Sequence, residues 1–131
     1  MTKSLDTSIL VRLCVGDVPK QVAAANHLLA TNPKLAVADA AIIEAEHVLQ
    51  SWYRYDRDRI TKTLQMLLSQ PNLNCNRTLF GEALAHYQKH PALSLVDCCL
   101  AIYAKLGNAA PLLTFDRKLA NQLQHAELLA A

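Results

Sequence analysis

The sequence twice places an acidic residue directly between a short apolar run and the start of a helical pattern. Toward one end of the chain, the apolar run 112–115 leads into Asp116, and Arg117 then opens a helix. Toward the other end, Leu5 leads into Asp6, and a second helical pattern follows. Where strands alternate with helices, the strands pair in parallel and ligands bind beyond their carboxyl ends. We therefore predict that Asp6 and Asp116 lie at the same edge of a parallel sheet.

The rest of the chain continues this alternation. The periodicity predicts strands at residues 3–5, 35–38, 72–75, 111–114 and 127–130, and helices at residues 9–15, 19–30, 39–52, 56–68, 77–89, 94–106 and 116–124. Asp39 is expected to cap one of these helices, and Gly107-Asn108 to end another. We expect an α/β fold, a three-layer α/β/α sandwich with a mainly parallel central sheet, in a single domain over residues 1–131.

The composition narrows the class of protein. A net charge of +2 is too small to indicate nucleic-acid binding by bulk electrostatics. Asp6 interrupts any apolar segment of a signal peptide, and no apolar run approaches the roughly 20 residues of a membrane span. Cys14, Cys75, Cys98 and Cys99 lack the C-x-x-C spacing of a zinc site, so we expect free thiols in a reducing compartment. These features predict a cytoplasmic protein with no membrane partner.

Two further acids lie within apolar helical patterns. Asp97 has apolar residues three and four positions away, where an isolated buried carboxylate would be costly. Glu44 shares a helical stripe with Val48 and has no capping role available. A salt bridge is the alternative interpretation for Glu44, and helical spacing alone does not separate Glu44 from Glu46.

Helix capping is the alternative interpretation for the aspartates. Asp6 and Asp116 each stand where an N-cap residue would stand. Ser94 and Asp97 have the S-x-x-D spacing of a capping box. Carboxylates brought close together repel one another, and a hard cation such as Mg²⁺ or Mn²⁺ removes that cost. Such a cation activates a water for phosphodiester hydrolysis, so the chemistry needs no nucleophilic side chain.

Four motifs carry a family resemblance. They are D-T-S-I-L at residues 6–10, E-x-x-x-V-L at 44–49, S-L-V-D-C-x-L-A-x-x-A at 94–104, and L-L-T-F-D-R-K-L at 112–119. Together they resemble the PIN domain and, more narrowly, the VapC-type ribonuclease toxins of prokaryotic toxin–antitoxin operons. The resemblance implies an α/β/α fold and endoribonuclease activity that depends on Mg²⁺ or Mn²⁺. It also implies a homodimer that is inhibited by a cognate antitoxin protein.

The resemblance also assigns residues to the site. It implies that the catalytic and metal-binding acids are Asp6, Glu44, Asp97 and Asp116, with Glu44 preferred to Glu46 because V-L follows it at the family's spacing. Ser8 and Thr114 are candidates to hydrogen-bond the carboxylates or metal-bound waters, with simple capping as the alternative. Ser94 stands where many relatives carry an acid, so a hydroxyl or a water is expected there.

Contacts to RNA are expected from Arg12 and Arg117, which lie near two of the acids in sequence. The segment 52–55, Trp-Tyr-Arg-Tyr, combines aromatic and basic side chains as proteins that bind single-stranded RNA do. A surface or dimer contact is the more common role of such a segment. The alternative function for the whole chain is a non-catalytic PIN-like module that binds RNA or a protein.

Overall fold

The structure is a computed structural model that describes residues 2–131. The chain divides into two compact units, which meet in sequence between Asn76 and Arg77. Unit 1 precedes this point and unit 2 follows it. Each unit is described by itself.

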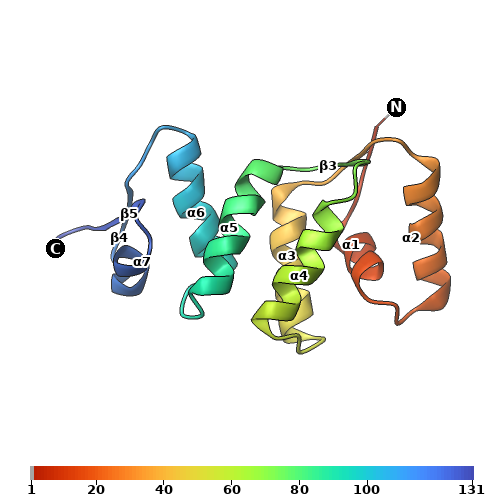
Figure 1. Ribbon diagram of the computed structural model, residues 1–131, viewed down its shortest axis with the longest axis horizontal. Helices are drawn as coiled ribbons and strands as arrows, with labels where there is room; N and C mark the ends of the chain where they lie inside the picture. The colour runs from red at the N-terminus through yellow and green to blue at the C-terminus, as the bar shows by residue number, and fades with distance from the viewer. Residues whose placement is uncertain (1) are drawn as a thin grey trace. The chain divides into compact units, whose positions relative to one another are not determined.

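Unit 1 contains a parallel sheet and helices that follow its strands. The strands are β1 (Lys3–Ser4), β2 (Leu35–Ala36) and β3 (Leu73–Asn74), and they pair in the order β1-β2-β3. The helices are α1 (Thr7–Cys14), α2 (Pro19–Thr31), α3 (Asp39–Ser51) and α4 (Arg57–Leu68). Helix α1 packs against α2, α3 and α4, and α3 and α4 lie side by side (Figure 1). This packing places Asp6, between β1 and α1, beside Glu44 and Val48 of α3.

The core of unit 1 is aliphatic. Fully buried side chains from both sheet and helices form it: Leu10, Leu35, Ile42, Leu49, Ile60, Leu64 and Leu73. Within α3 and α4 these members recur at the seven- and four-residue spacings of one helix face, which is why those segments form helices that cover the sheet. The core therefore fixes where α1 and α3 face each other.

Unit 2 is built around a pair of helices and a parallel pair of strands. Helices α5 (Arg77–Lys89) and α6 (Leu95–Leu106) pack on each other through buried side chains that include Phe80, Tyr87 and Ile102. Strands β4 (Leu112–Thr114) and β5 (Ala126–Leu128) flank the short helix α7 (Arg117–Gln122). β4 pairs with β5 in parallel, with Leu112 opposite Ala126.

The predicted α/β fold with a parallel sheet flanked by helices is confirmed. Each predicted strand and helix has a counterpart, and every strand pair within residues 2–131 is parallel. The strands form two sheets, β1-β2-β3 in unit 1 and β4-β5 in unit 2. The single domain over residues 1–131 stays a prediction. Within residues 2–131, no helix combines the length and apolar character that a membrane crossing requires.

The prediction that Asp39 caps a helix is wrong. The N-cap of α3 is Ala38, which makes no side-chain capping bond. Asp39 is the first helical residue, and its Oδ2 accepts a hydrogen bond of 3.4 Å from Nδ2 of Asn76. An acid in the first turn still interacts favourably with the positive end of the helix dipole. Asp39 can therefore stabilise the start of α3 although it is not the N-cap.

Helix α6 ends at the predicted place, but Asn108 rather than Gly107 adopts the left-handed conformation. Asn108 has a φ of 53°, whereas Gly107 has a φ of −86°. The backbone N–H of Ala109 donates to the carbonyl of Ala104 at 2.8 Å, and that of Asn108 donates to the carbonyl of Lys105 at 3.2 Å. These two bonds form a Schellman motif, which satisfies carbonyls at the end of the helix.

The conformation of Asn108 leads to a stability prediction. Asn108→Ala is expected to lower the free energy of unfolding by about 1 kcal/mol, because a Cβ-bearing residue without a short polar side chain is strained at positive φ. Asn108→Gly is expected to leave it unchanged or slightly raised. Urea denaturation of the two variants measures the difference. Equal midpoints for Ala and Gly at this position would contradict the prediction.

Candidate functional site

A pocket of about 300 Å³ in unit 1 brings Asp6 and Glu44 together. Asp6 stands between β1 and α1, at the carboxyl end of the strand, and Glu44 comes from α3. The pocket is lined by these two acids and by Thr7, Ser8, Val11, Arg12, Val48, Trp52 and Tyr53. The packing of α1 against α3 therefore joins two acids that are far apart in the sequence.

Asp6 caps α1 with one of its two carboxylate oxygens. Its Oδ2 accepts hydrogen bonds from the hydroxyl of Ser8 at 2.8 Å and from the backbone N–H of Ser8 at 3.4 Å. The bond from the Ser8 hydroxyl is the largest cause that lowers the pKa of Asp6 below its ordinary value, followed by backbone bonds from Ser8 and Thr7. Asp6 is thus an ionised carboxylate at neutral pH, the form in which it can bind a cation.

Glu44 is exposed on α3, and its carboxylate has no hydrogen bond or ion pair within residues 2–131. The salt bridge considered as an alternative for Glu44 is therefore absent from the described residues. Glu46 lies two positions further along the helix, is only 7% exposed and does not line the pocket. Glu44 and Glu46 thus differ in burial and in their position relative to the pocket, a difference that helical spacing alone did not reveal.

In unit 2, Asp97 takes part in a capping box at the start of α6. The Ser94 Oγ accepts a bond of 3.1 Å from the backbone N–H of Asp97, and Asp97 Oδ2 accepts a bond of 3.4 Å from the backbone N–H of Ser94. The capping alternative for this pair is therefore formed in the structure. Ser94 serves the helix start and fixes the backbone from which the Asp97 carboxylate projects.

Asp116 follows β4 closely and is the N-cap of α7. Its Oδ1 accepts backbone N–H bonds from Lys118 at 2.9 Å and Leu119 at 3.4 Å. The hydroxyl oxygen of Thr114 accepts the backbone N–H of Asp116 at 3.0 Å. Thr114 therefore orients the backbone of Asp116, while the exposed Arg117 side chain has no partner among residues 2–131.

Capping by the three aspartates is compatible with cation binding. In Asp97 and Asp116, one carboxylate oxygen accepts the capping bonds and the other has no hydrogen-bond partner in the described part of the chain, and in Asp6 the bonds from Ser8 go to Oδ2. A carboxylate offers about four lone-pair sites on two oxygens, so a helix N–H and a cation do not compete. These oxygen donors fit Mg²⁺ or Mn²⁺ in their chemistry.

The acids belong to two separately described units. Asp6 and Glu44 share a pocket in unit 1, whereas Asp97 and Asp116 belong to unit 2. The joint placement of all four around one cation therefore stays a prediction. Over residues 2–131, no three His, Cys, Asp or Glu side chains are gathered as a ready metal site.

A polar cluster that local sequence patterns did not reveal supports one wall of the acid pocket. Arg12 donates from Nη1 to Asp17 Oδ1 at 2.5 Å and to the Tyr53 hydroxyl at 2.9 Å, and from Nε to Gln21 Oε1 at 2.8 Å. The Tyr53 hydroxyl donates to Asp17 Oδ2 at 2.6 Å, which is the largest cause that lowers the pKa of Asp17. Arg12 is thus paired with an anion, and its predicted contact to RNA stays a prediction.

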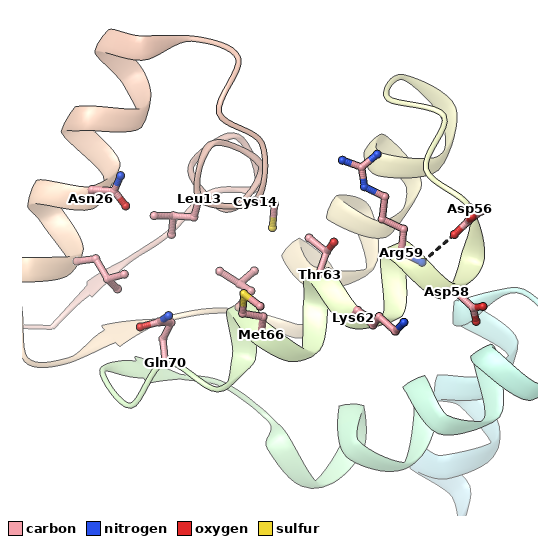
Figure 2. A pocket seen from close by; sticks show the side chains of 12 residues that line it. Leu13, Cys14, Asn26, Asp56, Asp58, Arg59, Lys62, Thr63, Met66 and Gln70 are labelled. Carbon is pink, nitrogen blue, oxygen red and sulfur yellow. Dashed lines mark hydrogen bonds between the residues drawn. The ribbon is translucent and has the colours of Figure 1, made fainter.

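A larger pocket of about 550 Å³ lies elsewhere in unit 1 (Figure 2). Its lining includes Cys14 and Met66, together with Asp56, whose Oδ1 accepts the backbone N–H of Arg59 at 2.8 Å. Burial raises the pKa of the Cys14 thiol to about 12, so this cysteine stays protonated and unreactive. None of the four predicted acids lines this pocket, so the smaller pocket is the one that matches the predicted chemistry.

Comparison with known proteins agrees with this description of the fold. The family model of the PIN domain matches residues 4–122. Among solved structures, the chain is similar to the crystal structure of PAE2754 from Pyrobaculum aerophilum, with 21% sequence identity, a TM-score of 0.38, and coverage of 98% of this chain and 83% of that one. No curated protein matches the chain. The match to the family model extends over nearly the whole sequence, and the chain belongs to the PIN domain family, whose members are generally metal-dependent nucleases.

Proposed function

We propose that this PIN domain is a metal-dependent endoribonuclease and the toxin of a type II toxin–antitoxin pair. The reaction is hydrolysis of an RNA phosphodiester bond by a metal-activated water. The observation that carries the proposal is the shared pocket of Asp6 and Glu44 at the carboxyl end of β1. Family membership supplies the chemical class, because PIN domains are generally metal-dependent nucleases.

The proposed cation ligands are Asp6, Glu44, Asp97 and Asp116. When bound, Mg²⁺ or Mn²⁺ lowers the pKa of a water and neutralises charge that builds on the phosphate. The chain holds its own groups ready for this. The Ser8 hydroxyl orients the Asp6 carboxylate by a hydrogen bond of 2.8 Å to Oδ2. The capping bonds at α6 and α7 restrict the Asp97 and Asp116 side chains before any ligand arrives.

Arg117 is the proposed contact to RNA phosphate in unit 2. Its guanidinium is exposed, directly follows Asp116 and has no protein partner within residues 2–131. A free guanidinium pairs well with a phosphate through two parallel hydrogen bonds. Arg12 is the second proposed contact, although its pairing with Asp17 also makes it a support for the wall of the acid pocket.

The toxin role adds partners to the proposal. We propose a cytoplasmic homodimer whose activity is blocked by a cognate antitoxin protein. The four motifs at residues 6–10, 44–49, 94–104 and 112–119 support this narrower assignment by their resemblance to VapC-type toxins. Arrest of bacterial growth when the chain is expressed, and release from that arrest when a neighbouring small gene is expressed with it, would test the toxin role directly.

The nuclease activity is tested with a mixed pool of RNA. Purified protein is incubated with the pool in Mg²⁺ or Mn²⁺, with and without excess chelator, and the products are separated by size. Discrete shorter fragments are expected with metal, and intact RNA is expected with chelator. RNA that is bound but stays intact in both metals would instead identify a non-catalytic RNA-binding module. Cleavage that resists the chelator would contradict the metal-dependent mechanism.

A further inference from the structure

An exposed tryptophan stands on the rim of the acid pocket. Trp52 is 78% exposed and lines the same pocket as Asp6 and Glu44. A large aromatic side chain left in water forgoes the stabilisation that its burial would bring. The exposed indole therefore stands beside the proposed catalytic acids Asp6 and Glu44.

The backbone around Trp52 is held in place. Trp52 is the C-cap of α3, and its N–H donates to the carbonyl of Val48 at 2.9 Å. The N–H of Tyr53 donates to the same carbonyl at 3.3 Å, and Arg54 turns the chain with a φ of 59°. Beyond the turn, the backbone N–H of Tyr55 donates to the carbonyl of Leu49 in α3 at 3.0 Å. The indole is therefore carried by a fixed piece of backbone.

Trp52, Tyr53 and Tyr55 differ in the contacts that their side chains make within the protein. The hydroxyl of Tyr53 is bonded to Asp17 and Arg12. The ring of Tyr55 is covered by the guanidinium of Arg59 at 3.7 Å from its centroid. Trp52 alone of the three has no ring contact, no cation on its face and no hydrogen bond from its indole N–H within the described residues. Most of the indole surface is therefore accessible to a ligand.

We propose that Trp52 is the stacking platform for one base of a single-stranded RNA substrate. This proposal rests on the proposed function, because an RNA phosphate held by a cation at Asp6 and Glu44 would bring a neighbouring nucleotide to the same pocket. Bases of single-stranded RNA stack on aromatic side chains, and such stacking accepts any base because every base has a π face. Trp52 would therefore select single strands over duplexes without selecting a sequence.

The indole is also a specific reporter, because Trp52 is the one tryptophan of the chain. The protein is titrated in chelator with a 12-nucleotide single-stranded RNA of mixed sequence, and the intrinsic fluorescence of Trp52 is followed. Stacking is expected to quench the emission saturably. The matched control is an oligomer of the same length that has ribose and phosphate but no bases, which is expected to leave the emission unchanged. Equal quenching by both oligomers would overturn the proposal.

Substitution gives a second, independent measurement. Trp52→Ala is expected to weaken binding of fluorescently labelled RNA by about 5- to 150-fold, the change that corresponds to about 1–3 kcal/mol for one stacked base. Trp52→Phe is expected to restore much of the affinity, since it keeps a ring. The control is Met66→Ala, which truncates another exposed apolar side chain on α4 and is expected to bind RNA as the wild type does. Melting curves verify that each variant is folded.

The results separate this proposal from the proposed function. RNA cleavage with an unchanged KM in Trp52→Ala would overturn the stacking platform and leave the nuclease standing. Base-dependent quenching without any cleavage in Mg²⁺ or Mn²⁺ would keep the platform and remove the nuclease. An emission that shifts to the blue with rising protein concentration in the absence of RNA would place Trp52 in a protein contact, which overturns the platform.

Discussion

Asp6→Asn is expected to lower the rate of RNA cleavage by more than about 100-fold, while Asp56→Asn leaves the rate unchanged. Both aspartates are N-caps in unit 1, Asp6 of α1 and Asp56 of α4. Asn caps a helix about as well as Asp, so each substitution keeps the cap and removes only the negative charge. Loss of a partner that merely supports a metal ligand typically costs 10- to 100-fold, and loss of a ligand should cost more.

The pair of variants separates chemistry from folding. Cleavage of a labelled RNA is followed under single-turnover conditions in Mn²⁺, and the melting midpoint of each variant is recorded without metal. Similar midpoints with a large difference in rate would assign the effect to the carboxylate of Asp6. If Asp6→Asn cleaves RNA as fast as Asp56→Asn does, Asp6 has only the capping role.

The positions of Asp6 and Asp116 could be predicted because they depend on local structure. An acid directly after a strand and before a helix must lie at the carboxyl end of that strand, wherever the boundaries fall within a residue or two. The capping interpretation and the site interpretation both used this geometry. The structure adds that Asp97 and Asp116 each cap with a single oxygen, so the capping bonds use one oxygen of the carboxylate and leave the other for a cation.

The choice between Glu44 and Glu46 shows what helical periodicity leaves open. The two residues are two positions apart, on different faces of α3, and either face was consistent with the apolar spacing. Which of them is buried depends on how α3 packs against its neighbours α1 and α4, and that packing depends on side chains from several elements. A family motif could favour Glu44, but local spacing carried no information about the partner helix.

The cluster of Arg12, Asp17 and Tyr53 could not be predicted from the sequence for a related reason. Arg12 and Tyr53 are 41 residues apart, and Tyr53 and Asp17 are 36 residues apart. Asp17 lies only five residues after Arg12, but it lies beyond the end of α1, so no helical spacing predicts that the two charges pair. Long-range polar contacts of this kind follow from the fold as a whole. Likewise, no local pattern indicated that the strands would form two sheets.

Asp97→Asn is expected to abolish RNA cleavage and to remove the stabilisation that Mn²⁺ gives the wild type. A ligand at 100 times its Kd adds about 2.7 kcal/mol to the free energy of unfolding, which for a chain of this size raises the melting midpoint by on the order of 10 °C. The midpoint of Asp97→Asn should not respond to Mn²⁺. Without metal its free energy of unfolding should stay within about 1 kcal/mol of that of the wild type, because an Asn side chain can still accept the N–H of Ser94 and only the favourable interaction of the charge with the helix dipole is lost.

The control for Asp97 is Asp58→Asn, which removes an acid from the first turn of α4 just as Asp97→Asn removes one from the first turn of α6. Loss of charge near a helix start affects both variants, so only the response to Mn²⁺ distinguishes them. Asp58→Asn should keep the full Mn²⁺ shift and the wild-type cleavage rate. An equal shift in both variants would remove Asp97 from the ligand set. A shift lost in Asp6→Asn and in Asp97→Asn alike would instead mean that unit 1 and unit 2 each supply a ligand on which Mn²⁺ binding depends.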